Sequence, residues 1–381
     1  MTEIHACRTQ RMRRRAAWGL TVLLGIVAGC SETASVPDDS QSVAAADSLS
    51  RPPLNEGETA EAVATIPTNP FSPVDKPALP AASRIVHAPP RFQRGEQFPV
   101  IRTVTQTLTQ NSAQGTTSST SRLEAEMILA AEESREDGSS RLGVQFERLR
   151  YSRDLAGDKF EFDSQNPAAV LPADVLPYRG LAGNRFALWV GHDNTIQELV
   201  GFSDFLNRSL ASLPADGRAA IASHFDALPP EEIVSQFLDE SVGLLHDDSA
   251  VRGGSTSSVK VGENWTRLRS VQLPVAHHIS TKYSIVSCTP EFAEIELAGT
   301  IAPPKEPAAQ PVAVVIHRGH VFGRCRIDRR TGLPIDSQTE QQLEMHVPTA
   351  NGTRIEQQKR VVTTFRVGLP GADSARGANA N

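Results

Sequence analysis

Cysteine and aromatic residues are scarce in this sequence of 381 residues, and its 38 basic residues are outnumbered by 44 acidic ones. It contains four cysteines, three Trp and three Tyr, and aromatic residues make up 5% of the chain. Stacking platforms for sugars or single-stranded nucleic acid use more exposed aromatic side chains than this. The formal net charge is −6 at pH 7. We therefore expect no nucleic-acid partner and no electrostatic binding to anionic lipid headgroups.

The sequence also lacks the motifs that carry common chemistry. It has no HExxH, no GxSxG, no phosphate-binding glycine loop, no CxxC pair and no dinucleotide fingerprint. Histidines are the remaining candidates, but His277 and His278 are neighbours on a predicted strand and point to opposite faces. His317 and His320 are also on different faces, unless a bulge at Gly319 reunites them. We predict no catalytic residue, no metal site and no cofactor, and expect that the protein is not an enzyme.

The longest uncharged apolar run, residues 16–26, follows three arginines at positions 13–15. It is too short to cross a bilayer as a helix, and this order of segments is typical of a signal peptide. The run ends in Val-Ala-Gly-Cys, which resembles the lipobox of bacterial lipoproteins. The resemblance implies that residues 1–29 are removed and that the Cys30 thiol carries a lipid with acyl chains such as palmitate. Removal takes away five arginines and one glutamate, so the net charge changes from −6 to about −10.

A lipid on Cys30 implies attachment to a membrane of the cell envelope. Acyl chains contribute about 0.8 kcal/mol per buried methylene group, so a triacylated cysteine is a durable anchor. Ser31 follows the cysteine, and by resemblance to the sorting rule of enterobacterial lipoproteins it favours the outer membrane, facing the periplasm. The start of translation is open between Met1 and Met12, and Cys7 is present only in the longer form.

Low-complexity segments flank the part of the chain that we expect to fold. Residues 30–90 are rich in Ser, Ala, Pro and Asp and show no helical or strand period. This composition predicts a disordered spacer that holds the folded part clear of the membrane. Residues 368–381 are small and polar and predict a disordered tail. The folded domain is therefore expected over residues 91–367.

Alternating apolar residues predict strands in two regions, 92–200 and 259–367. Phe98 and Val100 share one parity in the first region, and a change of parity at Leu149 indicates a bulge. The strands expected in the second region are 259–273, 278–288, 292–301, 312–327, 334–347 and 354–367. Their short connections favour an antiparallel meander.

Turns are marked by glycine and polar residues. Residues 185–200 predict a hairpin with His192 and Asp193 in its turn, and turn chemistry explains both residues better than catalysis does. Arg94–Phe98 and Val261–Trp265 each open a strand with glycine, an acid, a polar residue and an aromatic. Glycine permits the turn and the aromatic anchors the first inward position, so the two sheet units are expected to begin alike.

A helical group is predicted between the two strand regions, over residues 203–246. Pro230 lies near the first turn of its third helix, with Glu231 and Glu232 beside it. These adjacent acids point in different directions and make a poor acid/base pair. An apolar stripe at helical spacing is predicted to pack on a sheet, and it consists of Ile233, Phe237, Leu238 and Leu245, with Val242 beside it.

The folded domain holds two cysteines, Cys288 and Cys325. An exported pair is a candidate disulfide. Cys325, however, alternates with Val321 and Ile327 on what looks like the buried face of a strand, where a small apolar thiol packs well. The disulfide and two free thiols both remain open, and the alternation favours the thiols.

These patterns predict a β-rich α+β fold with antiparallel, twisted sheets or a half-barrel and a small inserted helical group. The order of the strand regions, the VGENW strand opening and the FGRCRIDRRTGLPIDSQ turn resemble a family of exported lipoproteins. That family is best represented in planctomycetes and is known only as a domain of unknown function. The resemblance covers about residues 92–367, supports the architecture and implies no activity or site residue.

Three classes of function are open at this point. The first is a non-enzymatic binding or structural module, tethered through Cys30, with a protein partner in the envelope. The second is a carrier or chaperone of lipid or another apolar ligand, resembling envelope lipoprotein carriers in which a curved sheet and inserted helices enclose a pocket. The third, an envelope enzyme, needs His192 or His317 to meet an acid or nucleophile in a concave pocket.

Overall fold

The computed structural model describes residues 92–112, 115–168, 170–172, 175–245, 260–271, 275–303, 314–348 and 354–368. The predicted signal peptide, the lipid site at Cys30, the spacer and residues 369–381 of the predicted tail lie outside these residues. All of the described residues belong to one compact unit.

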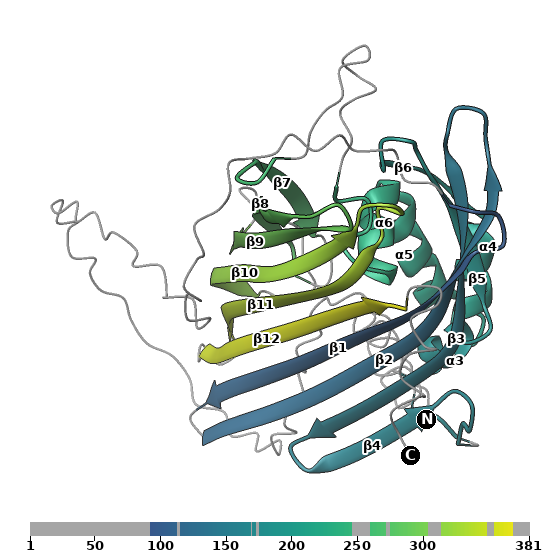
Figure 1. Cartoon of the computed structure of the whole chain (residues 1–381). Helices are drawn as coiled ribbons and strands as arrows, with labels where there is room; N and C mark the ends of the chain where they lie inside the picture. The colour runs from purple at the N-terminus through teal and green to yellow at the C-terminus, as the bar shows by residue number, and fades with distance from the viewer. Residues whose placement is uncertain are drawn as a thin grey trace, which may run out of the picture. The chain divides into compact units, whose positions relative to one another are not determined.

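Twelve strands in the described part of the chain form one open antiparallel sheet, which is twisted and curved (Figure 1). Its order is β6-β5-β3-β2-β1-β12-β11-β10-β9-β8-β7, and β4 pairs with β3. The strands are β1 (Gln97–Ser112), β2 (Gly115–Ser134), β3 (Ser140–Leu155), β4 (Asp158–Asp163), β5 (Arg185–Val190), β6 (Ile196–Val200), β7 (Asn264–Val271), β8 (His277–Cys288), β9 (Phe292–Ala302), β10 (Val315–Asp328), β11 (Pro334–Pro348) and β12 (Arg354–Val367). The β-rich antiparallel prediction is confirmed, and the pairing of β1 with β12 joins the two predicted strand regions into one sheet.

Strand parity decides which side chains face inward. Phe98, Val100 and Val104 of β1 are buried and alternate with more exposed residues, as predicted. In β3, the partner of Glu126 is Arg148, and the partner of Met127 is Phe146, so Glu147 is an extra residue. This bulge changes the inward parity of β3 and confirms the prediction made from Leu149.

Four described helices accompany the sheet: α3 (Leu176–Leu181), α4 (Phe202–Ser209), α5 (Ala215–Asp226) and α6 (Pro230–Phe237). The last three match the predicted helical group. Proline in the first turn fits the start of both α3 and α6, because an N–H is not needed there. The sequence analysis did not predict α3. The predicted apolar stripe is buried along its whole length, although Leu238, Leu245 and the neighbouring Val242 lie beyond the end of α6.

The apolar core consists of two clusters. The first joins α3–α6 to the inward residues of β1, β2, β3 and β5, and it contains a group of six phenylalanines: Phe146, Phe186, Phe202, Phe205, Phe225 and Phe237. The second cluster lines the inner face of β8–β11, with Leu244 and Leu245 from the segment after α6. Within the described residues, no member of α3–α6 belongs to this second cluster. The helices therefore cover one half of the inner face.

The two predicted strand openings have the same backbone geometry. Gly95 and Gly262 have φ of +84° and +90°, a region that glycine occupies without strain. The N–H of Gly95 donates to the Ala131 carbonyl, and that of Gly262 donates to the Ile285 carbonyl, each on the neighbouring strand. Both turns thus attach the start of a strand to its partner in the same way. The sequence echo reflects a repeated turn.

Candidate functional site

Polar side chains interrupt the apolar inner face in the middle of the sheet. Arg102 and Gln106 of β1 and Lys359 of β12 are 4%, 7% and 2% exposed and share the inward parity of their apolar neighbours. Along β1, Arg102 and Gln106 lie between Val100, in the first apolar cluster, and Leu108, in the second. We name these three inward polar residues of β1 and β12 the polar band. It separates the two clusters.

A cavity of about 80 Å³ lies between the polar band and α6. Its lining includes Glu232 and Gln236 of α6, Asp239 and Glu240 just after α6, Arg102 of the polar band, and Arg269 and His277 from β7 and β8. The Oε1 atom of Gln236 is buried and has no hydrogen-bond partner among the described residues. The cavity is far smaller than an ordinary lipid pocket, and its wall combines charged, polar and apolar side chains.

Opposite charges face one another across this cavity. The Arg269 guanidinium lies 2.5 Å from an Oε2 oxygen of Glu240. Burial raises the pKa of Glu240, and the charge of Arg269 opposes that rise. Burial also lowers the pKa of Arg102 to about 10, with the charge of Asp239 acting in the opposite direction. These side chains stay inside because each has a partner of opposite sign.

Asp239 fixes the segment after α6 to the sheet. Its Oδ1 oxygen accepts hydrogen bonds from the Ser241 N–H at 2.9 Å and from the Ser337 hydroxyl of β11 at 2.9 Å. Ser241 also donates its hydroxyl to the same oxygen. A carboxylate with several donors is held in one orientation. The acidic end of α6 is therefore a fixed part of the cavity wall.

His277 is a neutral imidazole in this wall. Its Nδ1 lies 2.8 Å from the Val275 carbonyl, which can only accept, so Nδ1 carries the proton. Burial lowers the pKa of His277 to about 4, against the effect of this hydrogen bond. His278 is exposed on the opposite face, as predicted.

The buried imidazole gives the first testable prediction. The unfolded state takes up a proton near pH 6.5, and the folded state takes it up only near 4. The stability that depends on neutral His277 is thus complete above about pH 6.5 and is lost as the pH falls toward 4. We expect the step from pH 7.5 to about pH 4.5 to cost the wild type about 2–3 kcal/mol more than His277→Gln. Urea unfolding at both pH values measures it, and equal losses in the two proteins would contradict this account.

Lys359 is a buried amine of the polar band. Its Nζ atom is buried and has no hydrogen-bond partner among the described residues. Burial lowers the pKa of the amine well below its ordinary value. Its cross-strand neighbour Leu343 and the next inward residue of β12, Val361, both line the cavity. Lys359 therefore lies beside the cavity, at the edge of the second apolar cluster.

The other predicted site residues lie elsewhere. Cys288 and Cys325 are free thiols on β8 and β10, and β9 lies between these strands. Two strand spacings amount to about 9–10 Å, more than a disulfide spans, so the structure has the free-thiol alternative. His192 and Asp193 lie in the turn between β5 and β6 and do not line the cavity.

The adjacent acids Glu231 and Glu232 have different surroundings. Glu232 lines the cavity, and burial raises its pKa, whereas Glu231 is exposed. Trp265, expected to anchor the core, packs against the second apolar cluster and stacks on Tyr283 with ring centroids 5.6 Å apart. Neither arrangement is a catalytic pair or a ligand platform.

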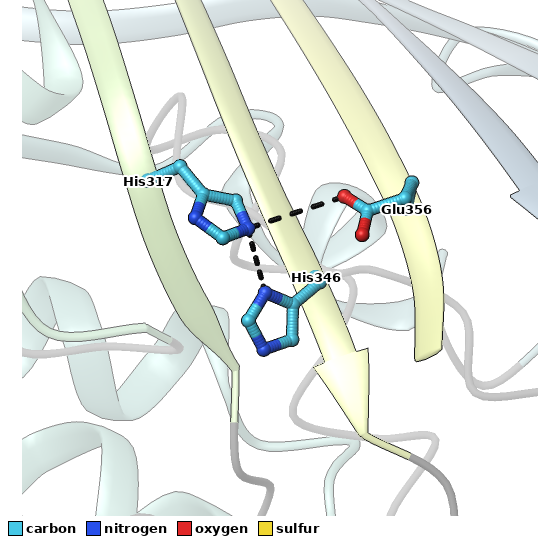
Figure 2. Close-up of side chains that lie close together, drawn as sticks. All are labelled: His317, His346 and Glu356. Carbon is cyan, nitrogen blue, oxygen red and sulfur yellow. Dashed lines mark hydrogen bonds and ion pairs between the residues drawn. The ribbon is translucent and has the colours of Figure 1, made fainter. Parts of the chain in front are cut away.

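The structure brings His317 together with residues that the sequence analysis did not connect to it. His317 of β10, His346 of β11 and Glu356 of β12 converge on the outer face of the sheet (Figure 2). The alternative left open for a bulge at Gly319 is not observed: the bulge of β10 lies at His317 itself, and His320 is not a member of the cluster. The outer-face cluster is distinct from the inner cavity.

The protein thus belongs to the β-rich class, with a curved, open antiparallel sheet and helices on one half of its inner face. A cavity with charged side chains in its wall lies beside these helices. The chain belongs to the family of unknown function DUF6263, which matches residues 137–334. This match confirms one part of the resemblance found in the sequence, namely that the folded part is a domain of unknown function. Comparison with curated proteins gives no match.

Similar solved structures are distant. One is described as an outer membrane lipoprotein-sorting protein domain from Vibrio parahaemolyticus, with 9% identity over 73% of this chain and 90% of that chain, and a TM-score of 0.12. Two from Pseudomonas aeruginosa, OpdL and OccK5 (OpdH), have 9% and 7% identity over 72% of this chain and 99% of theirs, with TM-scores of 0.17 and 0.19. Similarities of this size do not establish a shared fold. Among the described residues, no helix has the length and apolar character needed to cross a membrane.

Proposed function

We propose that this protein is an envelope lipoprotein whose folded unit is a non-enzymatic binding module. In this proposal Cys30 holds it to a membrane, on the periplasmic side of the outer membrane. The cavity beside α6 takes a small polar ligand that carries an anionic group. The observation that carries the proposal is Lys359, a buried amine without a hydrogen-bond partner in the described part of the chain.

A buried amine without a partner costs stability, and a bound anion would remove that cost. Burial penalises the charged form of Lys359, whereas a carboxylate or phosphate oxygen within hydrogen-bond distance favours it. The acids of the cavity wall do not fill this role: Asp239 is held by Ser241 and Ser337, and Glu240 is paired with Arg269. An anionic group of a ligand is the missing partner in this account.

The wall of the cavity, which Lys359 adjoins but does not line, supports binding rather than catalysis. Arg102 and Arg269 face Asp239 and Glu240, so each strongly charged group already has an opposite charge nearby. The Gln236 oxygen, which has no hydrogen-bond partner in the part of the chain that the structure describes, supplies an acceptor for a second polar group of the ligand. His277 uses its Nδ1 proton to bond to the backbone. We accordingly assign these residues to ligand recognition.

Native mass spectrometry tests this proposal on the full chain purified from its own envelope. We expect a ligand adduct on the wild type that disappears on denaturation and is absent from Lys359→Met. Lys282→Met is the matched control, because Lys282 is exposed on β8, and it should keep the adduct. A bare mass for the wild type, or the same adduct on Lys359→Met, would overturn the proposal.

The second apolar cluster favours one other function, that of a carrier of an apolar ligand. Ile316, Leu343 and Met345 face inward, and no residue of α3–α6 joins their cluster in the described part of the chain. Burying an acyl chain among apolar side chains is favourable at about 25 cal/mol per Å². These side chains are themselves buried, so an acyl chain would have to open the cluster in order to bind. The same mass spectra separate the two functions. An adduct of lipid mass that persists in Lys359→Met would support the carrier.

A further inference from the structure

A β-bulge places an extra side chain on the outer face of β10. Ile316 pairs with Met345 and Arg318 pairs with Glu344, so His317 has no residue directly opposite it. His317 and Arg318 are consecutive and both exposed, which regular strand alternation does not allow. On β12, Glu356 is the direct cross-strand partner of His346. The bulge therefore adds His317 to the side of an existing His346–Glu356 pair.

The three side chains point toward one another from three neighbouring strands (Figure 2). The His346 Nδ1 lies 2.6 Å from the His317 Nε2, and that Nε2 lies 4.0 Å from the Glu356 Oε2. One ligand atom from each residue lies within 4.8 Å of the others. Side-chain exposure is 46% for His317 and 56% for Glu356, so both have room to rotate.

This arrangement suits a divalent cation. Two facing imidazole nitrogens at 2.6 Å need a proton or a cation between them, because two lone pairs repel. Tetrahedral ligands that each lie about 2.0–2.1 Å from Zn²⁺ are about 3.3 Å from one another. The distance between the two imidazole nitrogens, 2.6 Å, is shorter than this value, and that between the His317 Nε2 and the Glu356 Oε2, 4.0 Å, is longer. Small rotations of the exposed side chains bring all three atoms to a common ion.

Neighbouring charges leave the carboxylate of this cluster available. Arg318, next to His317, donates two hydrogen bonds to Glu344, both of 2.8 Å. This bidentate pair neutralises Arg318 and occupies Glu344. The Glu356 Oε2 lies 4.0 Å from the His317 Nε2. Arg318 is therefore engaged with Glu344, and Glu356 can serve as the third ligand.

We propose that His317, His346 and Glu356 form a binding site for one first-row divalent metal ion, of which Zn²⁺ is the representative. Two imidazoles and one carboxylate are a set that Zn²⁺ accepts with a fourth position open. That position is on the surface, where water or a donor group of another molecule completes the coordination. The site lies on the opposite face of the sheet from the inner cavity and does not depend on its ligand.

The test uses the full chain, treated with EDTA, dialysed, and titrated with Zn²⁺ by calorimetry at pH 7.5. We expect one Zn²⁺ per chain in the wild type. His317→Gln and His346→Gln should each weaken Zn²⁺ binding at least about 100-fold. Even the loss of a residue that only hydrogen-bonds to a metal ligand lowers the affinity for the metal about 10–100-fold. Glu356→Gln should weaken binding about 10-fold or more. Co²⁺ in place of Zn²⁺ should give a visible absorption band that the histidine variants lose.

His278→Gln serves as the control, because it removes an exposed histidine on β8 and should bind Zn²⁺ like the wild type. Circular dichroism in EDTA verifies the fold of each variant, and three separate ligand variants keep the test intact if one of them unfolds. A wild type that binds no Zn²⁺ at millimolar concentration, or variants that bind it equally well, would overturn the proposal.

Discussion

Replacing Phe237 by alanine is expected to cost about 4 kcal/mol of unfolding free energy. The side chain is 1% exposed and lies at the end of α6, among five other phenylalanines. Its ring centroid is 5.5 Å from those of Phe202, Phe205 and Phe225, and 6.0 and 6.4 Å from those of Phe186 and Phe146. Removing the ring opens a cavity where α4, α5 and α6 meet the sheet, and the surrounding rings cannot all close it.

Chemical unfolding of purified Phe237→Ala measures this cost. Phe160→Ala is the control, because Phe160 is half-buried on β4, which pairs with β3 alone, and it should cost about 1 kcal/mol. Equal losses in the two variants would mean that the aromatic cluster does not anchor the helices. The loss in Phe237→Ala should also loosen the acidic segment that begins at Asp239, two residues further on.

Lys359→Met is expected to stabilise the ligand-free protein by about 2 kcal/mol, or by about 4–8 °C in melting temperature. Methionine keeps most of the length of the side chain and carries no charge that burial penalises. Its neighbours across the strands, Leu108 and Leu343, are apolar and buried, so the thioether packs well among them. A substitution that stabilises the fold and abolishes ligand binding would assign Lys359 to function rather than to structure.

Thermal unfolding of stripped wild type, Lys359→Met and Lys282→Met provides the comparison. Lys282 is exposed, so its substitution should change the melting temperature by no more than about 1 °C. If Lys359→Met is less stable than the stripped wild type, the lysine has a structural partner and the binding account loses its basis.

The sequence was enough to predict much of this fold, because alternation within strands is a local signal. The parity change at Leu149 placed the bulge of β3, and the strands of the second region were predicted close to their observed bounds. The pairing of β1 with β12 was not predictable in this way, since no local pattern encodes contact between residues that are more than 240 positions apart. The short helix α3 was missed because its sequence, LPYRGL, contains Pro177 and Gly180 and is typical of a turn.

The inner site left a signal that was overlooked. Arg102 has the same parity as Val100 and Val104, and Lys359 has the same parity as Val361 and Phe365. A charged residue at an inward position of an otherwise apolar strand face is the pattern of a buried functional group. The outer cluster left no such signal, because it depends on a register shift at His317 and on the pairing of three strands.

The most direct test of the central claim is the pKa of the Lys359 amine, with and without the natural ligand. Nitrogen-15 NMR of the lysine Nζ atoms, assigned by the loss of one signal in Lys359→Met, reports this value. We predict that Lys359 is charged at neutral pH in protein purified gently from its envelope. After the ligand is stripped, its pKa should fall well below the ordinary lysine value, as burial requires. The same pKa in both preparations would contradict the proposal that an anionic ligand is the partner of Lys359.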